Sequence, residues 1–348
     1  MGRTVLSSLN DSLHRMMGDD ERVIVLGEDL LDPYGGAFKV TRGLSTEFAD
    51  RVWTTPISEA GFVGVATGMA MRGLRPIVEI MFGDFVLLAA DQLINHAAKF
   101  RWMYGDRVDV PLVVRLPMGG RRGYGPTHSQ SLEKHFLGVP GLVVVAVNPL
   151  VDPGELLETA VLKDDRPLLF IENKKMYARP VRAAIDGRIG ALRVRRTEGD
   201  YPTVTAGFGG PQTAEATLVA YGGMVEIALA AAEEMLIEEE RYVEVVVPTA
   251  LNPFDVTPVL ESLATTGRLV VCEEASAAAG FGAEVTAAVC DQGFDLLRAA
   301  PMRVAAKAVP IANAPPLEQA ILPGQEDIVA ALRKSLGGRG QSIRIATG

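Results

Sequence analysis

The sequence predicts an α/β protein made of two three-layer, doubly wound domains, and three observations lead to this prediction. The chain has 348 residues, which is too long for one ordinary core and typical of two domains. Short β-rich runs alternate with helical patterns, as expected for the crossovers of parallel sheets. The strand-like runs are almost continuously apolar, which is typical of strands covered by helices on both faces.

The first domain is expected over residues 1–190. Its predicted strands are 22–29, 51–57, 74–80, 110–117, 141–148 and 166–173. Its predicted helices are 59–72, 84–103 and 152–163. Because helices separate most of the successive strands, we expect these strands to run parallel in one sheet.

Charges, glycine and proline then replace any periodicity, and residues 191–214 are interpreted as a linker. A second domain is expected over residues 215–337, where the βα alternation resumes. Its predicted elements are the strands 216–222, 242–248, 268–274 and 301–307 and the helices 224–238, 281–292 and 326–336. The glycine-rich tail 338–348 is expected to be disordered.

The composition is that of an acidic globular protein, with 43 acidic against 34 basic residues and a formal charge of −9. This charge, and the lack of a basic stripe interleaved with aromatic residues, argue against a nucleic-acid partner. No apolar run is long enough for a membrane helix, and the N-terminus lacks the apolar core of a signal peptide, so we expect a cytoplasmic protein. Cys272 and Cys290 are interpreted as buried thiols in a reducing compartment.

Two segments are candidates for a functional site. Glu59 is an isolated acid between an apolar run and a helix of small residues. The local pattern alone favours a simpler explanation, in which an acid in the first turn of a helix complements the helix dipole and Ser58 caps the helix. The glycine-rich loop 116–131 follows an apolar strand and carries His128. An ordinary surface histidine remains the alternative. The four histidines lack the spacing of metal ligands, and no phosphate-binding or dinucleotide-binding motif occurs.

Several segments, taken in order, resemble one family. They are GEDLLDPYGGAFKVTRGL (27–44), TPISEAGFVGVATGMAMRGLRPIVEI (55–80), GDFVLLAADQLINHAAK (83–99), GPTHSQSLEKHFLGVPGL (125–142) and TGRLVVCEEASAAAGFGAEVTAAV (266–289). The chain resembles, from about residue 4 to 336, the beta subunit of the thiamine-diphosphate-dependent decarboxylating component of 2-oxo acid dehydrogenase complexes. The resemblance implies a thiamine-pyrimidine-binding domain followed by a transketolase C-terminal-like domain.

The resemblance also implies roles for individual residues in binding the pyrimidine half of the cofactor. Glu59 would hydrogen-bond the aminopyrimidine ring and favour the tautomer that activates the thiazolium carbon. Glu28 would lie near the same ring, and Ile57 would contact it through its backbone. Phe85, with Phe82 as second choice, would stack on the ring, and a core phenylalanine is the alternative for either.

His128 matches a family histidine that assists proton transfer and acceptance of the lipoyl substrate. A structural potassium ion, as in some relatives, would be held by the main-chain carbonyls of Leu112, Ala160 and Val161. Two departures concern the substrate or partner: Gly138 replaces a usual histidine, and the segment 247–255 reads VPTALNPFD.

The resemblance implies that a second chain completes the site. The motif that holds magnesium and the diphosphate is absent here, so we expect an alpha subunit to carry it in an α2β2 heterotetramer. The expected reaction is decarboxylation of a 2-oxo acid and transfer of the acyl group to a lipoyl-bearing acyltransferase. The alternative is a transketolase-like transfer of a two-carbon unit from a ketose phosphate to a carrier protein or other acceptor.

Overall fold

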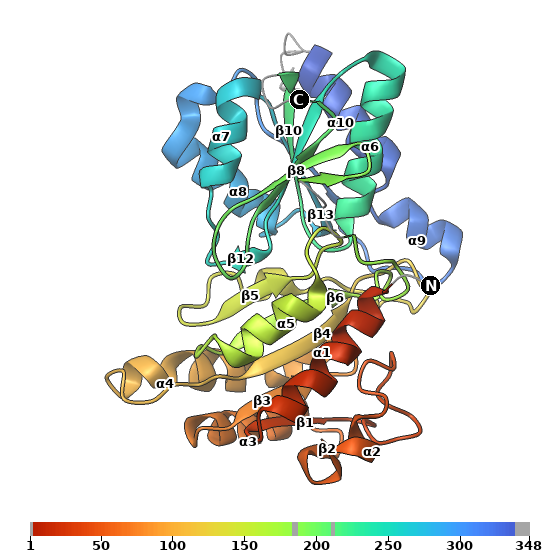
Figure 1. Ribbon diagram of the computed structural model, residues 1–348. Helices are drawn as coiled ribbons and strands as arrows, with labels where there is room; N and C mark the ends of the chain where they lie inside the picture. Colours follow the sequence, from red (N-terminus) through yellow and green to blue (C-terminus); the bar gives the residue numbers. More distant parts are fainter. Residues whose placement is uncertain (1–2, 183–186, 210–212, 338–348) are drawn as a thin grey trace, which may run out of the picture.

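The computed structural model describes residues 3–182, 187–209 and 213–337 (Figure 1). Within these ranges the chain forms two 7-stranded sheets, and helices cover both faces of each sheet. The predicted α/β class with two doubly wound sheets is therefore confirmed. The tail 338–348, expected to be disordered, lies outside the described residues.

The first sheet has the strand order β12-β5-β6-β4-β3-β1-β2. Its strands are β1 (Val23–Gly27), β2 (Val52–Thr54), β3 (Arg75–Glu79), β4 (Val113–Met118), β5 (Val143–Ala146), β6 (Leu168–Asn173) and β12 (Ala250–Asn252). All pairs are parallel except β12 with β5. The central strands are buried along their whole length because helices cover both faces, as their continuous apolar runs predict.

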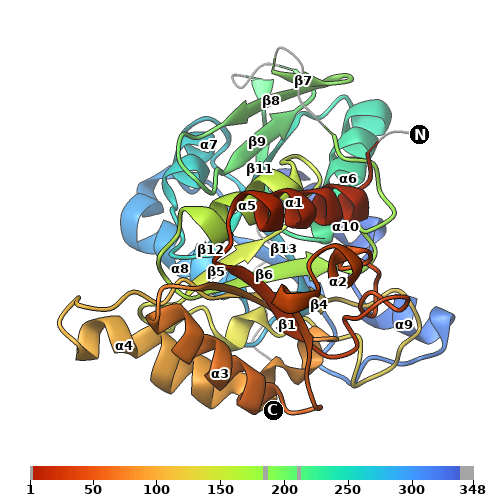
Figure 2. The same cartoon turned by 60° about the horizontal axis from the view of Figure 1, so that its bottom comes forward.

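Two layers of helices enclose the first sheet (Figure 2). The helices α1 (Val5–Asp19) and α5 (Pro153–Leu162) pack on one face. On the other face lie α3 (Glu59–Met71), the 3-10 helix η2 (Gly83–Ala89), the π-helix η3 (Gln92–Ala97) and α4 (Ala98–Met103). The single helix expected over 84–103 is thus three helical segments of different winding. The short helices α2 (Leu44–Glu47) and η1 (Ala49–Arg51) lie between β1 and β2 in the chain, and η4 (Glu133–His135) lies between β4 and β5.

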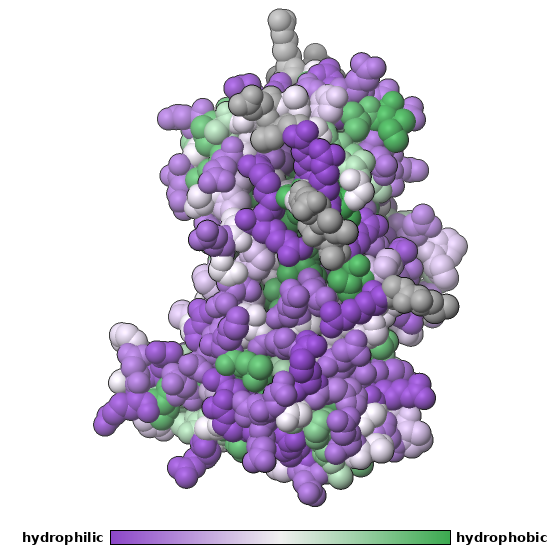
Figure 3. Space-filling view, in the orientation of Figure 1, coloured by the Kyte–Doolittle hydropathy of each residue, from purple (hydrophilic) through white to green (hydrophobic). Residues whose placement is uncertain are grey.

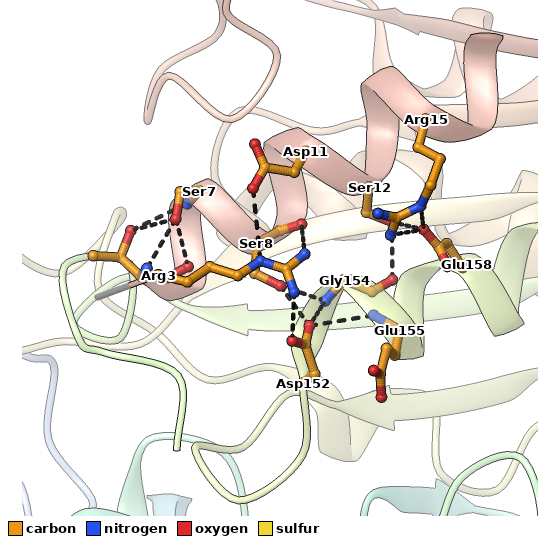
Figure 4. A network of polar contacts seen from close by, with 11 residues as sticks. Arg3, Ser7, Ser8, Asp11, Ser12, Arg15, Asp152, Gly154, Glu155 and Glu158 are labelled. Carbon is orange, nitrogen blue, oxygen red and sulfur yellow. Dashed lines mark hydrogen bonds and ion pairs between the residues drawn. The ribbon is translucent and has the colours of Figure 1, made fainter. Parts of the chain in front are cut away.

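A polar network joins α1 to the start of α5 (Figure 4). Asp152 caps α5, and its carboxylate also accepts hydrogen bonds from Ser8 Oγ at 2.5 Å and from Arg3 Nη1 at 2.8 Å. A Cβ on Gly154 would lie 2.6 Å from the main-chain oxygen of Ser8, so only glycine allows this approach. This network holds α1 against the first sheet. Helix α1 was not among the elements predicted from the sequence.

The second sheet has the order β14-β13-β10-β11-β9-β8-β7. Its strands are β7 (Arg188–Ile189), β8 (Leu192–Arg196), β9 (Val204–Gly207), β10 (Ala216–Ala220), β11 (Val243–Val247), β13 (Leu269–Ser276) and β14 (Met302–Ala306). Helices α6 (Met224–Glu239) and α10 (Gln325–Gly337) pack together on one face, and α7 (Thr257–Thr266) and α8 (Phe281–Gly293) on the other. Helix η6 (Phe294–Leu296) follows α8, and α9 (Pro315–Ile321) lies near the junction of the two sheets (Figure 1).

The segment 191–214, interpreted as a linker, instead supplies β8 and β9 to the second sheet. Both strands are antiparallel to their neighbours, whereas β10, β11, β13 and β14 are parallel. In β8 the apolar residues Leu192 and Val194 are buried, and the arginines between and after them are exposed. This alternation over two residues is typical of an antiparallel strand with one face in water. The arginines that were interpreted as ending the strand pattern are the exposed residues of this alternation.

Strand β12 connects the two halves, because it follows β11 in the chain and pairs with β5 of the first sheet. Its Asn252 side chain donates to the main-chain oxygen of Leu142 at 2.6 Å, and Ala146 N donates to Thr249 O at 2.9 Å. Residues 250–252, within the segment 247–255 singled out in the sequence analysis, therefore form an edge of the first sheet.

The surface is mostly hydrophilic on the face shown in Figure 3, with scattered hydrophobic patches. Several apolar side chains of α3, η2 and α4 are exposed, including Val65 at 56%, Leu88 at 60% and Trp102 at 85%. In the part of the chain that the structure describes, no helix combines the length and apolar character needed to cross a membrane.

Candidate active site

Two buried acids, Glu28 and Glu59, lie where strand ends meet a helix start in the first sheet. Glu28 directly follows β1, and Glu59 is the first residue of α3. Their side chains are only 5% and 4% exposed. The predicted cap is not formed, since the Ser58 side chain makes no capping hydrogen bond to α3. Helix capping therefore does not explain why this segment is polar.

Burial raises the pKa of Glu28 to about 7, and the negative charges of Glu59, Asp29 and Glu79 add to this effect. The main-chain N–H of Met81 opposes it by donating to the carboxylate. The oxygen Oε1 of Glu28 is buried and has no hydrogen-bond partner among the described residues. Glu28 and Glu59 thus form a carboxyl pair that the described chain leaves without a compensating cation. A buried carboxyl group whose pKa is strongly raised, as that of Glu28 is, is typical of catalytic and binding sites.

The contact with Met81 leads to an aromatic cluster, because Phe82 is the next residue. The Phe82 ring lies 4.7 Å from the imidazole of His128, and the Phe85 ring lies 5.2 Å from it, both edge to face. Phe82 also meets the ring of Tyr124 at 5.7 Å. Three residues predicted for the site, Phe82, Phe85 and His128, are therefore in one cluster.

Close packing of η2 on β4 positions these phenylalanines. A Cβ on Gly83 would lie 2.2 Å from Met118 Cγ, so glycine is required between Phe82 and the rest of η2. The neighbouring Asp84 is buried, and its Oδ1 accepts hydrogen bonds from Gln130 N at 3.1 Å and Gln130 Nε2 at 3.0 Å. Helix η2 is thus tied directly to the loop that carries His128.

The loop that carries His128 leaves the carboxyl end of β4 through Gly119. This glycine has a left-handed backbone with φ +89°, and a Cβ there would lie 2.4 Å from Asn173 Nδ2. His128 is partly exposed, and its Nδ1 lies 2.9 Å from Thr127 Oγ1. No hydrogen bond to the second ring nitrogen, Nε2, is found among the described residues. One imidazole nitrogen is therefore held and the other is left for a reactant.

Residues from the second sheet also reach this loop. Glu274 of β13 accepts from Gly120 N at 2.7 Å and from Ser131 Oγ at 3.3 Å. Glu318 of α9 accepts from Arg121 N at 2.7 Å and from Gly123 N at 3.0 Å. The loop with His128 therefore lies at the junction of the two halves, and both halves determine its position.

Sequence reasoning missed two features at this edge of the sheet. Lys174, directly after β6, is fully buried and donates to the main-chain oxygen of His128 at 2.5 Å. Arg115 of β4 is fully buried and pairs with Glu79 at 2.5 Å and Glu172 at 2.7 Å. A signal existed, because charged residues stand inside or directly after apolar strands whose carboxyl ends form one edge.

The remaining predicted residues lie apart from this cluster. Ile57 precedes α3 and has a side chain that is 84% exposed. Gly138, where the resemblance led us to expect a histidine, contributes no side chain to the loop.

The structure shows hydrogen-bond donors at two of the three carbonyls expected to hold potassium. The Val161 main-chain oxygen accepts from the Arg75 guanidinium at 2.7 Å, and the Leu112 oxygen accepts from Leu168 N at 2.8 Å. Ala160 lies in the last turn of α5. The permanent positive charge of Arg75 beside Val161 disfavours a further cation there, and the potassium site stays a prediction. Among the described residues, no group of three or more His, Cys, Asp or Glu side chains is arranged to bind a metal ion either.

Comparisons with known proteins assign the family. Residues 3–180 match the family described as transketolase, pyrimidine binding domain, and residues 211–328 match transketolase, C-terminal domain. The acetoin:2,6-dichlorophenolindophenol oxidoreductase subunit beta of Cupriavidus necator is 36% identical over 340 residues, which cover 95% of this chain and 96% of that protein. The chain belongs to the family of 2-oxo acid dehydrogenase beta subunits with transketolase-type domains.

Other members of this family agree in length and similarity. The pyruvate dehydrogenase E1 component subunit beta of Leifsonia xyli subsp. xyli is 38% identical over 333 residues, covering 95% of this chain and 94% of that protein. A solved structure described as a split gene transketolase, inactive beta4 tetramer, has a TM-score of 0.72 and 21% identity, and covers 97% of this chain and 99% of that one. At this identity the match shows the shared fold alone, so it does not favour the transketolase-like alternative. Membership in the family implies thiamine diphosphate as the cofactor.

Proposed function

We propose that this chain is the beta subunit of a thiamine-diphosphate-dependent enzyme that decarboxylates a 2-oxo acid. The observation that carries the proposal is the buried carboxyl pair Glu28 and Glu59, which has no cation among the described residues and lies beside the Phe82–His128 cluster. Leaving two acids uncompensated lowers the stability of a protein, so their presence favours a ligand that uses them. The 36–38% identity to the beta subunits named above over nearly their whole length supports the same function.

The residues present fit the pyrimidine half of the cofactor. Glu59 would accept a proton-sharing hydrogen bond from a ring nitrogen, and the unpartnered Oε1 of Glu28 offers a second polar contact. Phe85 is the better candidate for stacking, because the Phe82 ring already contacts Phe38, Tyr124, His128 and the Lys174 ammonium. The main chain at Ile57, just before Glu59, stays the predicted third contact. When bound, the cofactor supplies a carbon nucleophile and electron sink for the loss of carbon dioxide.

His128 is the chain's own group for proton transfer. Its ring is fixed between Thr127 and the two phenylalanines, which sets where Nε2 can act. A neutral imidazole with one free nitrogen can accept a proton from a reactant and return it in a later step. The same loop would face the lipoyl group of an acyltransferase during acyl transfer.

The cofactor's diphosphate and magnesium require a partner chain in this proposal. No described cluster of carboxylates is arranged for a metal, and the exposed side chains Val65, Leu88 and Trp102 provide apolar surface for a subunit contact. An alpha subunit would supply the missing ligands in an α2β2 heterotetramer.

The test is reconstitution with the alpha subunit, obtained by co-purification. Carbon dioxide release is measured with pyruvate and with a branched-chain 2-oxo acid. Acetoin and a ketose phosphate release no carbon dioxide, so reduction of an artificial electron acceptor is measured with acetoin and two-carbon transfer with the ketose phosphate. We expect turnover with one of the two 2-oxo acids, and only in the presence of both chains, thiamine diphosphate and magnesium. Full turnover by the beta chain alone, or turnover only with acetoin or only with the ketose phosphate, would contradict the proposal.

A further inference from the structure

Lys174 is a fully buried lysine at the carboxyl edge of the first sheet, directly after β6. Lysine is almost never fully buried unless it is paired. Here its Nζ donates to the main-chain oxygen of His128 at 2.5 Å, and it lies 5.1 Å from the Phe82 ring centroid and 5.7 Å from that of Tyr124. No carboxylate of the described residues is within ion-pair distance of the ammonium. The strongest polar partner of this charge is therefore the backbone of His128.

The surroundings keep the ammonium form available despite its burial. Burial lowers the pKa of Lys174 to about 8, and the nearby positive charge of Arg122 acts in the same direction. The carboxylates of Asp84, Glu274 and Glu318 oppose this effect from three other elements. At pH 7 the side chain thus remains mostly protonated and able to donate. A charge-assisted hydrogen bond to a carbonyl is stronger than one between neutral groups.

The backbone at His128 has few other restraints. His128 N donates to Gly125 O at the long distance of 3.4 Å, and the next firm contact of the loop is at Gln130, which Asp84 holds. The Lys174 contact lies between these two points. Because the imidazole is attached to this short stretch of backbone, its distance from Phe82 and the direction of Nε2 depend on that contact.

We propose that Lys174 is the positioning residue for His128, acting through the hydrogen bond from its ammonium to the His128 carbonyl. It holds the imidazole at the place where Nε2 meets the reactant, and it does not itself exchange a proton with the substrate. The inference rests on the proposed role of His128 in proton transfer. A displacement of a catalytic group by about 1 Å costs up to about 100-fold in rate.

A double-mutant cycle in the reconstituted enzyme tests the inference. The variants are Lys174→Met, His128→Asn and the double variant, with turnover measured on pyruvate, or the 2-oxo acid found active above, and lipoamide as acceptor. We expect Lys174→Met to lower kcat about 10- to 100-fold with little change in KM. In the His128→Asn background the same change should have less than about a twofold effect, because two residues that act as one unit are not additive. An undiminished effect of Lys174→Met in that background would overturn the inference.

Two controls separate positioning from folding. Lys175→Met changes the neighbouring exposed lysine and should leave kcat unchanged. Lys174→Gln keeps a hydrogen-bond donor without the charge and should give an intermediate kcat. If Lys174→Met does not fold, equal kcat values for Lys174→Gln and the wild type would overturn the inference.

Hydrogen exchange of residues 125–131 distinguishes this inference from the proposed function. We expect faster exchange there in Lys174→Met and unchanged exchange in Lys175→Met. Full activity of His128→Asn would refute the role of His128, while faster exchange would still support the contact itself. Unchanged exchange in Lys174→Met would overturn the positioning role, whatever the activity of the His128 variant.

Discussion

The first sheet holds two pairs of buried acids, and only one pair has a cation between them. Glu79 and Glu172 are 3% and 1% exposed, and the guanidinium of Arg115 binds both, with Nε and Nη2 donating to the two oxygens of Glu172 at 2.7 and 2.8 Å. Glu28 and Glu59 are buried to nearly the same degree and have no such partner. All four acids are at most 5% exposed, so the two pairs differ mainly in whether a cation lies beside them.

The comparison distinguishes buried charged residues that stabilise the fold from buried charged residues that take part in the reaction. In the Arg115 network, the favourable ion-pair interactions offset much of the desolvation penalty of the buried charges. The hydroxyl of Tyr177 also donates a hydrogen bond to Glu172 at 2.7 Å. The unpaired Glu28 keeps its desolvation cost, which raises its pKa to about 7. Burial also raises the pKa of Glu79, but there the positive charge of Arg115 opposes the effect. We expect substitutions in the unpaired group to affect activity and substitutions in the paired group to affect stability.

The largest effect is expected for Glu59→Gln, which removes the acid and keeps its shape. Turnover of the reconstituted enzyme should fall by about 10²–10⁴-fold, the usual contribution of a proton-transferring group. The unfolding midpoint should stay unchanged or rise, because a buried charge without a partner is removed. Enzyme assay and thermal unfolding of the same samples measure both.

The matched control for Glu59 is Glu284→Gln, an exposed acid in the first turn of α8. Both residues have the same relation to a helix dipole, so a purely local role would give similar small changes in stability and none in turnover. Full turnover in Glu59→Gln would contradict the assigned chemistry.

The next largest effect is expected for Arg115→Met, on stability. Removing the guanidinium leaves Glu79 and Glu172 buried and unpaired, which costs about 3–5 kcal/mol of unfolding free energy. Urea unfolding of the purified chain measures it. Arg22→Met is the control, because Arg22 forms an ion pair with Asp20 while 56% exposed and should change stability by less than about 1 kcal/mol. Equal losses in the two variants would contradict the comparison.

The fold could be predicted from the sequence more completely than the site. The strands were predictable because burial on both faces requires continuous apolar runs, and β1, β3 and β6 fall within the predicted ranges. Strands β8 and β9 were missed because they are short antiparallel strands with only alternate residues buried, and the exposed arginines of β8 interrupt its apolar pattern. Such a short alternation over two residues is hard to distinguish from a polar linker.

The site was only partly predictable, because its geometry depends on long-range contacts. Phe82, Phe85 and His128 were named through a family resemblance, and the structure brings their rings together. Lys174 was missed because its role comes from a hydrogen bond to a residue 46 positions away. The contact of Arg75 with the expected potassium site could not be predicted for a similar reason, since Arg75 is 86 positions from the carbonyl of Val161 that it reaches.

A smaller effect is expected for Glu28→Gln, and it depends on pH. The pKa of this carboxyl is raised from 4.5 to about 7, so the native state keeps the proton after the unfolded state has lost it. Stability of the wild type therefore falls as pH rises through this window, relative to the glutamine variant. The variant should match the wild type at pH 4.5 and be more stable by about 1–3 kcal/mol above pH 7. Urea unfolding at pH 4.5, 6 and 8 measures the difference, and a constant difference across this range would contradict the unpaired state of Glu28.

The smallest effect on stability is expected from added potassium, because Arg75 supplies a positive charge from within the chain, as Arg115 does for the paired acids. Its guanidinium binds the Val161 carbonyl at 2.7 Å and the carboxylate of Asp165 at 2.7 Å, so the chain supplies its own cation there. Replacing sodium chloride by potassium chloride at equal ionic strength should leave the unfolding temperature within about 1 °C, since an ion that does not bind the native state cannot stabilise it. Arg75→Ala removes this cation and should lower the unfolding temperature in both salts. If potassium raises the unfolding temperature of Arg75→Ala more than sodium does, the carbonyls can still bind the ion when the guanidinium is removed. If potassium raises the unfolding temperature of the wild type, the guanidinium does not replace the ion.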